Sequence, residues 1–214
     1  MKKLLSVLLA LCLVLAAVPA AGIVVSADET FGDFTYNKTF SGVLEITGYK
    51  GSSAEITIPS QIVDEAVTAI GGNAFRNNTA ITSVEIPSTV KTIDYNAFQG
   101  CEALRSITVP DSVTKLETYA FDGCSALKTV VIGSGLAKID FGVFRNCISL
   151  EKVTLGANVT TIDTAFSDCT ALSEIVWNDK IETIGDRAFS DCTALRSLSI
   201  PASVKTIGSS AFRD

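Results

Sequence analysis

Five cysteines are the residues of this sequence that could most readily do chemistry, because they recur at one position of a repeated phrase. Each lies three residues after a phenylalanine, and Asn78 fills that position in the first copy; the five are Cys101, Cys124, Cys147, Cys169 and Cys192. Stacked thiols could form disulfides or bind a metal ion. An odd number in one repeating position is a poor disulfide framework, and the chain has no CxxC pair. We therefore expect buried free thiols that pack against a turn and hydrogen-bond it.

A second recurring position is acidic in four copies of the phrase and glycine in the other three. The acidic residues directly follow an isoleucine or leucine, at Asp94, Glu117, Asp140 and Asp163. Carboxylates stacked about 4.8 Å apart could attract Ca²⁺. The sequence offers no second column of oxygen ligands in the form of a calcium-binding loop. We therefore favour the interpretation that each carboxylate caps the turn that follows it.

Other chemistry has little support in the sequence. Trp177 stands where other copies have isoleucine, valine or leucine, so it either fills the core or marks a binding hot spot, and the inward-facing pattern favours the core.

The chain has no histidine, which excludes Ser-His and Cys-His nucleophiles and histidine-ligated metals. No glycine-rich phosphate loop is present. We expect no enzyme, no cofactor and no bound metal.

The elements that would position these residues come from an internal repeat. An alanine-phenylalanine pair, with valine for alanine once, recurs every 23 residues, except for one interval of 22. Its phenylalanines are Phe75, Phe98, Phe121, Phe144, Phe166, Phe189 and Phe212. The shorter interval lacks one residue between Ile162 and Ala165. Fixed apolar positions at such a period indicate a solenoid, in which each coil completes its core against its neighbours.

Each copy of the repeat also predicts its own local structure. Apolar–polar–apolar triplets such as Ile107-Thr108-Val109 predict short half-buried strands that stack into a parallel sheet. Proline, glycine or asparagine follows each strand, and a proline ends strand pairing because it has no N–H to donate. Two residues after each phenylalanine stands only Asn, Gly or Asp, which predicts a left-handed turn in every coil.

The segment IPSTVKTIDYNAFQGCEALRSITVP resembles the repeat of BspA-type leucine-rich repeat proteins, roughly IPxxVxxIGxxAFxxCxxLxxVx. The resemblance covers residues 54–214. It implies a leucine-rich repeat solenoid of about seven 23-residue repeats, with parallel β-strands stacked coil on coil and short helical or 3-10 turns. Residues 28–58 are expected to form N-terminal capping strands, and residues 59–214 the repeat array, which stops within its last repeat. The first coil has about five extra residues, between Pro59 and Ile70, which predicts a local loop.

Residues 1–27 have the pattern of a bacterial export signal. Lys2 and Lys3 precede an apolar run that is too short to span a membrane, and Val25-Ser26-Ala27 fits a cleavage site. The formal net charge of −6 becomes −8 without this segment, which holds two lysines and no acid. That balance argues against nucleic acid and anionic membranes as partners. We expect a secreted or cell-surface protein with no membrane span after signal removal.

A candidate binding face follows from the outward positions of the predicted strands. They are small, polar or β-branched, with charge at few places, and comprise Glu85, Thr108, Val131, Thr154, Val176 and Ser199, flanked by Lys152 and Glu174. Such a face suits broad contact with a protein or glycan better than capture of a small molecule. The family resemblance implies binding to extracellular proteins or glycoproteins, often in adhesion to host or microbial surfaces. The alternative is a non-binding rigid spacer or positioning module of a longer chain, because no polar cap follows the last coil.

Overall fold

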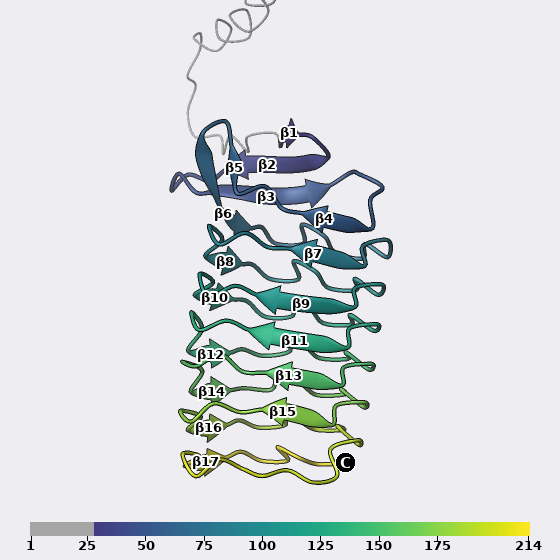
Figure 1. Cartoon of the computed structure of the whole chain (residues 1–214), viewed down its shortest axis with the longest axis vertical. Coiled ribbons are helices and arrows are strands. Elements are labelled where there is room, and N and C mark those ends of the chain that lie inside the picture. The colour runs from purple at the N-terminus through teal and green to yellow at the C-terminus, as the bar shows by residue number, and fades with distance from the viewer. Residues whose placement is uncertain (1–27) are drawn as a thin grey trace, which may run out of the picture.

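The computed structural model describes residues 28–214, which form one continuous stack of coils (Figure 1). The segment with the pattern of an export signal lies outside the described residues, so the boundaries expected for signal, cap and array stay predictions. About seven coils follow one another at the 23-residue period of the sequence, which confirms the predicted solenoid. Among the described residues, no helix is long and apolar enough to cross a membrane.

One side of the stack carries the strands that the apolar–polar–apolar triplets predict. They are β4 (Glu55–Thr57), β7 (Ser83–Glu85), β9 (Ser106–Val109), β11 (Thr129–Ile132), β13 (Lys152–Thr154) and β15 (Glu174–Val176). All pairings on this side are parallel, with β9, β11, β13 and β15 in one sheet and β4 with β7 in a separate pair. Side chains alternate between buried and exposed along each strand, as a half-buried sheet requires.

The strand predicted around Ser199 in the last coil does not form, so this prediction is wrong. In the fourth coil the N–H of Lys128 donates to the Arg105 carbonyl of the coil before it, at 2.8 Å. The equivalent N–H in the last coil, that of Arg196, instead donates to Ala194 within its own coil, at 2.9 Å. The local bond replaces the bond between coils, and the ladder stops at β15.

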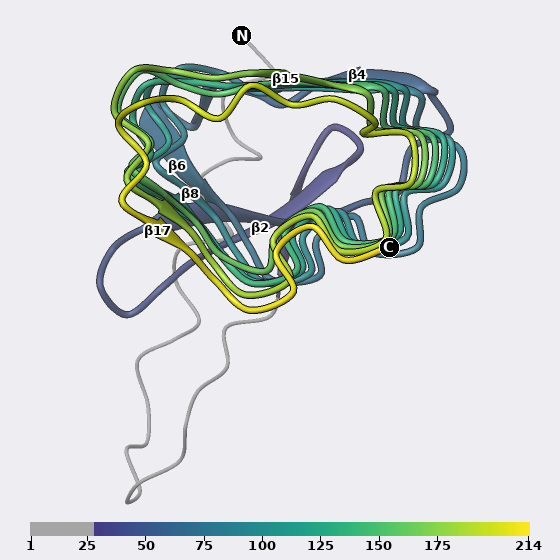
Figure 2. The same ribbon diagram turned by 90° about the horizontal axis from the view of Figure 1, so that it is seen from below.

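A second column of short parallel strands runs down the other side of the stack, as Figure 2 shows from the end. It comprises β6 (Glu65–Ile70), β8 (Thr92–Ile93), β10 (Lys115–Leu116), β12 (Lys138–Ile139), β14 (Thr161–Ile162), β16 (Thr183–Ile184) and β17 (Thr206–Ile207). The helical or 3-10 turns expected between strands are absent from residues 28–214. Hydrogen-bonded turns take their place.

In the Ala-Phe turn, backbone N–H groups alternate between two kinds of acceptor. The N–H of Phe98 donates to the Ala120 carbonyl of the next coil, at 2.7 Å. The N–H of Gln99 donates within its own coil, to the Asn96 carbonyl at 3.1 Å. The same alternation recurs from coil to coil, so these backbone donors are satisfied without a helix.

The predicted left-handed turn is present at Asn77, Gly100, Gly123, Asn146, Asp168 and Asp191, all with positive φ. A second left-handed position, which the sequence did not reveal, lies just before the alanine or valine of each pair. It is occupied by Asn73, Asn96, Tyr119, Gly142, Arg187 and Ser210. The 22-residue coil lacks this residue, because Asp163-Thr164 leads directly to Ala165. The short interval in the sequence is therefore the loss of one left-handed residue.

Stacked phenylalanines run through the whole core. Successive rings from Phe75 to Phe212 lie 4.8–5.4 Å apart, with interplanar angles of 1–8°. The repeat distance of parallel strands, about 4.8 Å, imposes this nearly parallel arrangement on rings that occupy the same position in each coil. The column is therefore a direct result of the exact repeat.

The two ends of the stack differ. At the N-terminal end, β1 (Glu29–Phe31), β2 (Phe34–Lys38) and β3 (Leu44–Tyr49) pair in antiparallel order. Strand β3 then pairs in parallel with β6. The loop predicted in the first coil is a hairpin that joins β5 (Gln61–Ile62) to β6. At the other end Ile207 is 52% exposed, whereas its equivalent Ile184 is fully buried, because no described residue packs on the outer side of the last coil.

Candidate protein-binding face

Four of the predicted face residues lie side by side on four neighbouring strands. The sheet register pairs Thr108 with Val131, Val131 with Thr154, and Thr154 with Val176. Val131 is 42% exposed and Val176 is 38% exposed, although both are apolar. The structure thus brings these residues into one outward row, and their role in binding stays a prediction.

Charged residues beside this row pair with one another across neighbouring strands. The Lys152 ammonium lies 2.7 Å from the Glu174 carboxylate, and the Lys128 ammonium lies 3.1 Å from that of Glu151. These exposed pairs add little stability. They do neutralise the flank of the row, so the face combines two exposed valines with nearly balanced charge.

Two predicted face residues are not part of this row. Glu85 lies on β7, in the separate two-stranded pair, and its carboxylate accepts a hydrogen bond from the Thr57 hydroxyl at 3.0 Å. Ser199 lies in the segment of the last coil that forms no strand. The candidate face is therefore shorter than the sequence suggested, and it ends where the β9–β15 sheet ends.

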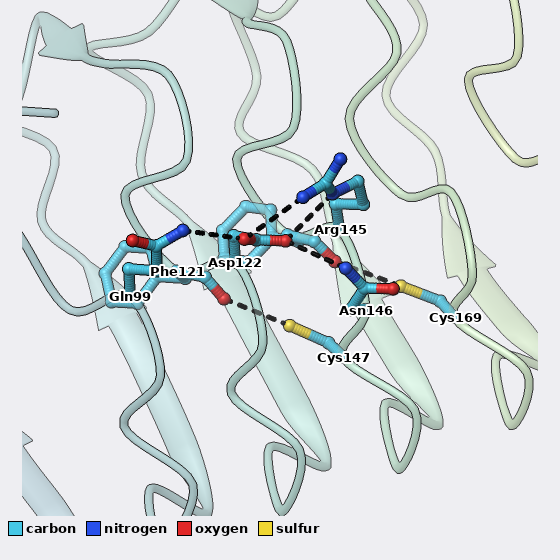
Figure 3. A network of polar contacts seen from close by, with 8 residues as sticks. Gln99, Phe121, Asp122, Arg145, Asn146, Cys147 and Cys169 are labelled. Carbon is cyan, nitrogen blue, oxygen red and sulfur yellow. Dashed lines mark hydrogen bonds and ion pairs between the residues drawn. The ribbon is translucent and has the colours of Figure 1, made fainter. Parts of the chain in front are cut away.

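The cysteines are free and buried, which confirms the structural interpretation. Each Sγ donates to the carbonyl of the phenylalanine in the preceding coil, for example Cys147 to Phe121 at 3.3 Å and Cys169 to Phe144 at 3.1 Å (Figure 3). Burial raises the pKa of Cys192 to about 12. Thiols held protonated in this way are poor nucleophiles and poor metal ligands.

The acidic side chains of the second recurring position interact with groups close to them in the structure. Asp94 and Asp163 each accept the N–H of the following residue, at 2.7 and 2.9 Å, which fits the predicted capping role. The Lys138 ammonium lies 2.7 Å from Asp140 and 3.1 Å from Asp163. Burial alone would raise the pKa of Asp163, but hydrogen bonds from Lys138 and from the backbone N–H of Thr164 hold it below its ordinary value. No cluster of three or more potential metal ligands occurs in residues 28–214.

Trp177 fills space at the edge of the core. Its ring is half-buried, packs against the core cluster, and meets the ring of Phe189 edge-on at 6.0 Å. This arrangement supports the core interpretation.

A polar network that sequence reasoning missed lies on the turn edge of the stack, at the position directly after each phenylalanine. The carboxylate of Asp122 is buried and accepts hydrogen bonds from Gln99 at 2.9 Å, Arg145 at 3.0 Å and Asn146 at 3.1 Å (Figure 3). The hydrogen bond to Asp122 raises the pKa of Arg145, whose guanidinium also lies 5.0 Å from the ring centroid of Tyr119. The opposite charges of Asp122 and Arg145, one repeat apart, were the signal in the sequence.

Comparison with known proteins agrees with the repeat. The BspA type Leucine rich repeat region family matches the chain in six copies, over residues 49–165 and 163–214. No curated protein matches the sequence.

Two solved structures share the fold. A leucine-rich repeat protein from Eubacterium ventriosum is 27% identical, with a TM-score of 0.67 over 85% of this chain and 49% of its own. The chain thus spans about half the length of that protein. The T. pallidum leucine rich repeat protein is also 27% identical, with a TM-score of 0.60 over 80% of this chain and 92% of its own.

Proposed function

The chain belongs to the BspA-type leucine-rich repeat family, and on this premise we propose that it is a secreted or cell-surface protein that binds other extracellular proteins or glycoproteins, in adhesion to host or microbial surfaces. The observation that carries the proposal is the row of Thr108, Val131, Thr154 and Val176 across four hydrogen-bonded strands. Exposed valines in such a row supply the apolar centre that a protein interface needs.

The opposite side of the stack is a weaker candidate for the same role. Its outward positions include Lys115 and Lys138, which are held in ion pairs with Glu117 and with Asp140 and Asp163. Burying such pairs in an interface would require their desolvation. The β9–β15 side presents small side chains at its centre and places its ion pairs at the flank, so a partner can cover the centre without burying a charge.

Export is the second part of the proposal. It rests on the predicted signal in residues 1–27 and on the family. The acidic balance of the remaining chain suits an extracellular protein and disfavours nucleic acid as a partner.

A binding measurement with matched valine variants tests the proposal. The purified chain is immobilised, and host extracellular-matrix proteins and bacterial surface proteins are passed over it. We expect saturable binding that weakens by about tenfold or more when Val131→Arg and Val176→Arg are combined. The control is Val63→Arg, at a valine that is 76% exposed on the β5–β6 hairpin, far from the row along the chain. Binding that the double variant leaves unchanged would remove this face from consideration.

The rigid-spacer alternative also has an observation in its favour. The unbroken column of stacked phenylalanines, from Phe75 to Phe212, joins every coil to the next and makes the array stiff. Absence of any saturable partner in the same experiment would favour this alternative.

A further inference from the structure

A hollow on the turn edge lies where the column that follows each phenylalanine changes from large to small residues. The column reads Arg76, Gln99, Asp122, Arg145, Ser167, Ser190 and Arg213. Ser167 and Ser190 are buried at the floor, and a cavity of about 510 Å³ opens over them between Arg145 and Arg213. This volume is within the range of small-ligand sites, roughly 300–1,000 Å³.

The position at which the 22-residue coil lacks one residue lies at the same hollow. Thr164 stands at the deletion, between the turns that carry Phe141 and Arg187. Phe141 is 42% exposed at this rim, and its ring meets that of Tyr119 edge-on at 5.4 Å. Two separate departures from the repeat, the serines and the deletion, therefore meet in one hollow.

The lining is rich in hydrogen-bonding groups and balanced in charge. Three arginines and three aspartates line it, namely Arg145, Arg187, Arg213, Asp168, Asp186 and Asp191. Some of these already have partners: Arg145 pairs with Asp122, and Asp186 accepts the N–H of Ser209.

Two charged groups of the lining are open to a ligand. Within residues 28–214, the side chains of Arg187 and Asp168 make no ion pair and no hydrogen bond. A guanidinium and a carboxylate of this kind offer donors and acceptors in fixed planes.

We propose that this hollow is a binding site for a neutral oligosaccharide. Adjacent hydroxyl groups of a sugar ring both donate and accept hydrogen bonds, so they match a lining that holds a carboxylate, Asp168, and a guanidinium, Arg187. The exposed ring of Phe141 offers a flat apolar surface for the C–H face of the sugar. Because three positive and three negative groups balance, the lining has no preference for an anionic or a cationic ligand.

A peptide fits the hollow less well. Peptides commonly add to an open backbone edge or insert an apolar anchor into a pocket. Here the backbone N–H groups of Phe166 and Asp168 already donate to the next coil, both at 2.9 Å, and Phe141 is the only large apolar residue among the lining residues. Side chains and hydroxyls are left as the binding groups, which suits a sugar.

The proposal does not depend on the protein-binding face. That face lies on the outward side of β9–β15, whereas the hollow lies at the Ala-Phe turns. One chain can therefore hold a glycan at one edge and a protein at the other, and either site can fail in a test without the other.

Two variants and one control test the oligosaccharide site in the whole chain. Ser167→Arg fills the hollow with a residue type that this column already accepts at Arg76 and Arg145. Arg187→Asn removes the unpaired guanidinium, and asparagine tolerates the positive φ of 52° at this position. The control Arg76→Asn makes the same chemical change as Arg187→Asn, in the column of Ser167 but outside the hollow.

The probes are neutral tetrasaccharides of glucose, galactose, mannose and N-acetylglucosamine, with binding followed by NMR titration and calorimetry. We expect at least one to bind with a Kd of about 1 mM or tighter. Ser167→Arg and Arg187→Asn should each weaken it by about tenfold or more, and Arg76→Asn should not. Arg187→Asn should keep or raise the melting temperature, which separates lost binding from lost folding.

Three outcomes would overturn the proposal. The first is the absence of binding by all four tetrasaccharides at about 10 mM. The second is binding that Ser167→Arg and Arg187→Asn both leave unchanged. The third is binding of a charged peptide, polyglutamate or polylysine, that these variants abolish while no tetrasaccharide binds.

Discussion

Removing one ring from the middle of the phenylalanine column should destabilise the chain strongly. Phe144 is fully buried, and its ring stacks between those of Phe121 and Phe166, at 5.3 Å on each side. Replacing a buried phenylalanine by alanine costs about 3–5 kcal/mol, since it removes apolar contacts and leaves a cavity. Two stacked partners place Phe144→Ala near the upper part of that range, at about 4–5 kcal/mol.

The last ring of the column provides the matched comparison. Phe212 is half-buried and stacks on Phe189 alone, at 5.4 Å. With one stacked neighbour and part of its surface already in water, Phe212→Ala should cost about 2 kcal/mol, roughly half as much. The difference between the two variants therefore measures the contribution of the coil on the second side.

Urea unfolding followed by fluorescence gives both values. Trp177 is the only tryptophan and lies 6.0 Å from the ring of Phe189, so its emission reports the packing of this region. Thermal unfolding followed by the same emission should show the melting temperature lowered by about 8–20 °C for Phe144→Ala and by about 4–8 °C for Phe212→Ala. Equal losses for the two variants, or a loss below about 1 kcal/mol for Phe144→Ala, would refute the argument that stability comes from coils stacked on both faces.

Three further measurements check other parts of the structure. Combining Val63→Asn with Asp64→Gly should raise the free energy of unfolding by about 1 kcal/mol, because both residues have positive φ and Asn-Gly favours this turn; a lower urea midpoint would contradict it. Burial raises the pKa of Cys192 from 9.0 to about 12, so its contribution to stability is complete below pH 9 and is lost as the pH rises toward 12. The urea midpoint should fall over this window, and less so in Cys192→Ala. The backbone amide of Ile207, whose side chain is 52% exposed, should exchange its hydrogen faster than the amide of Ile184, whose side chain is buried. Equal protection of the two amides would contradict this expectation.

The sequence predicted the parts of the fold that each coil repeats with the same residue types. The Ala-Phe period gave the stacking, and the alternation in segments such as Ile107-Thr108-Val109 gave the strands of one side. The second sheet was not foreseen, because two-residue strands such as Thr92–Ile93 are too short to show an alternation. The second left-handed position escaped because unrelated residues such as Tyr119 and Arg187 occupy it.

The sites were less predictable than the fold. The outward row at Thr108 and Val131 followed from the alternation, whereas Ser199 failed because a local hydrogen bond ended the ladder. The hollow depends on contacts between coils that no single repeat displays. Its signals were present only as departures from the repeat: the interval of 22 residues, and Ser167 and Ser190 where the other coils carry larger side chains.

Physical coupling between coils determines where such departures can occur. An inward residue such as Phe144 touches the same residue in two neighbours, so a change there costs contacts on both sides. The turn-edge column is more tolerant because four of its seven members, Arg76, Gln99, Arg145 and Arg213, reach solvent. In one part of it, Asp122 accepts hydrogen bonds from Gln99 and Arg145, and these contacts tie three coils together. At Ser167 the side chain is too short for such hydrogen bonds between coils, and a hollow lies there instead. A sugar in the hollow would restore hydrogen bonds that the protein lacks there, so ligand binding should stabilise the coils that the serines leave least connected.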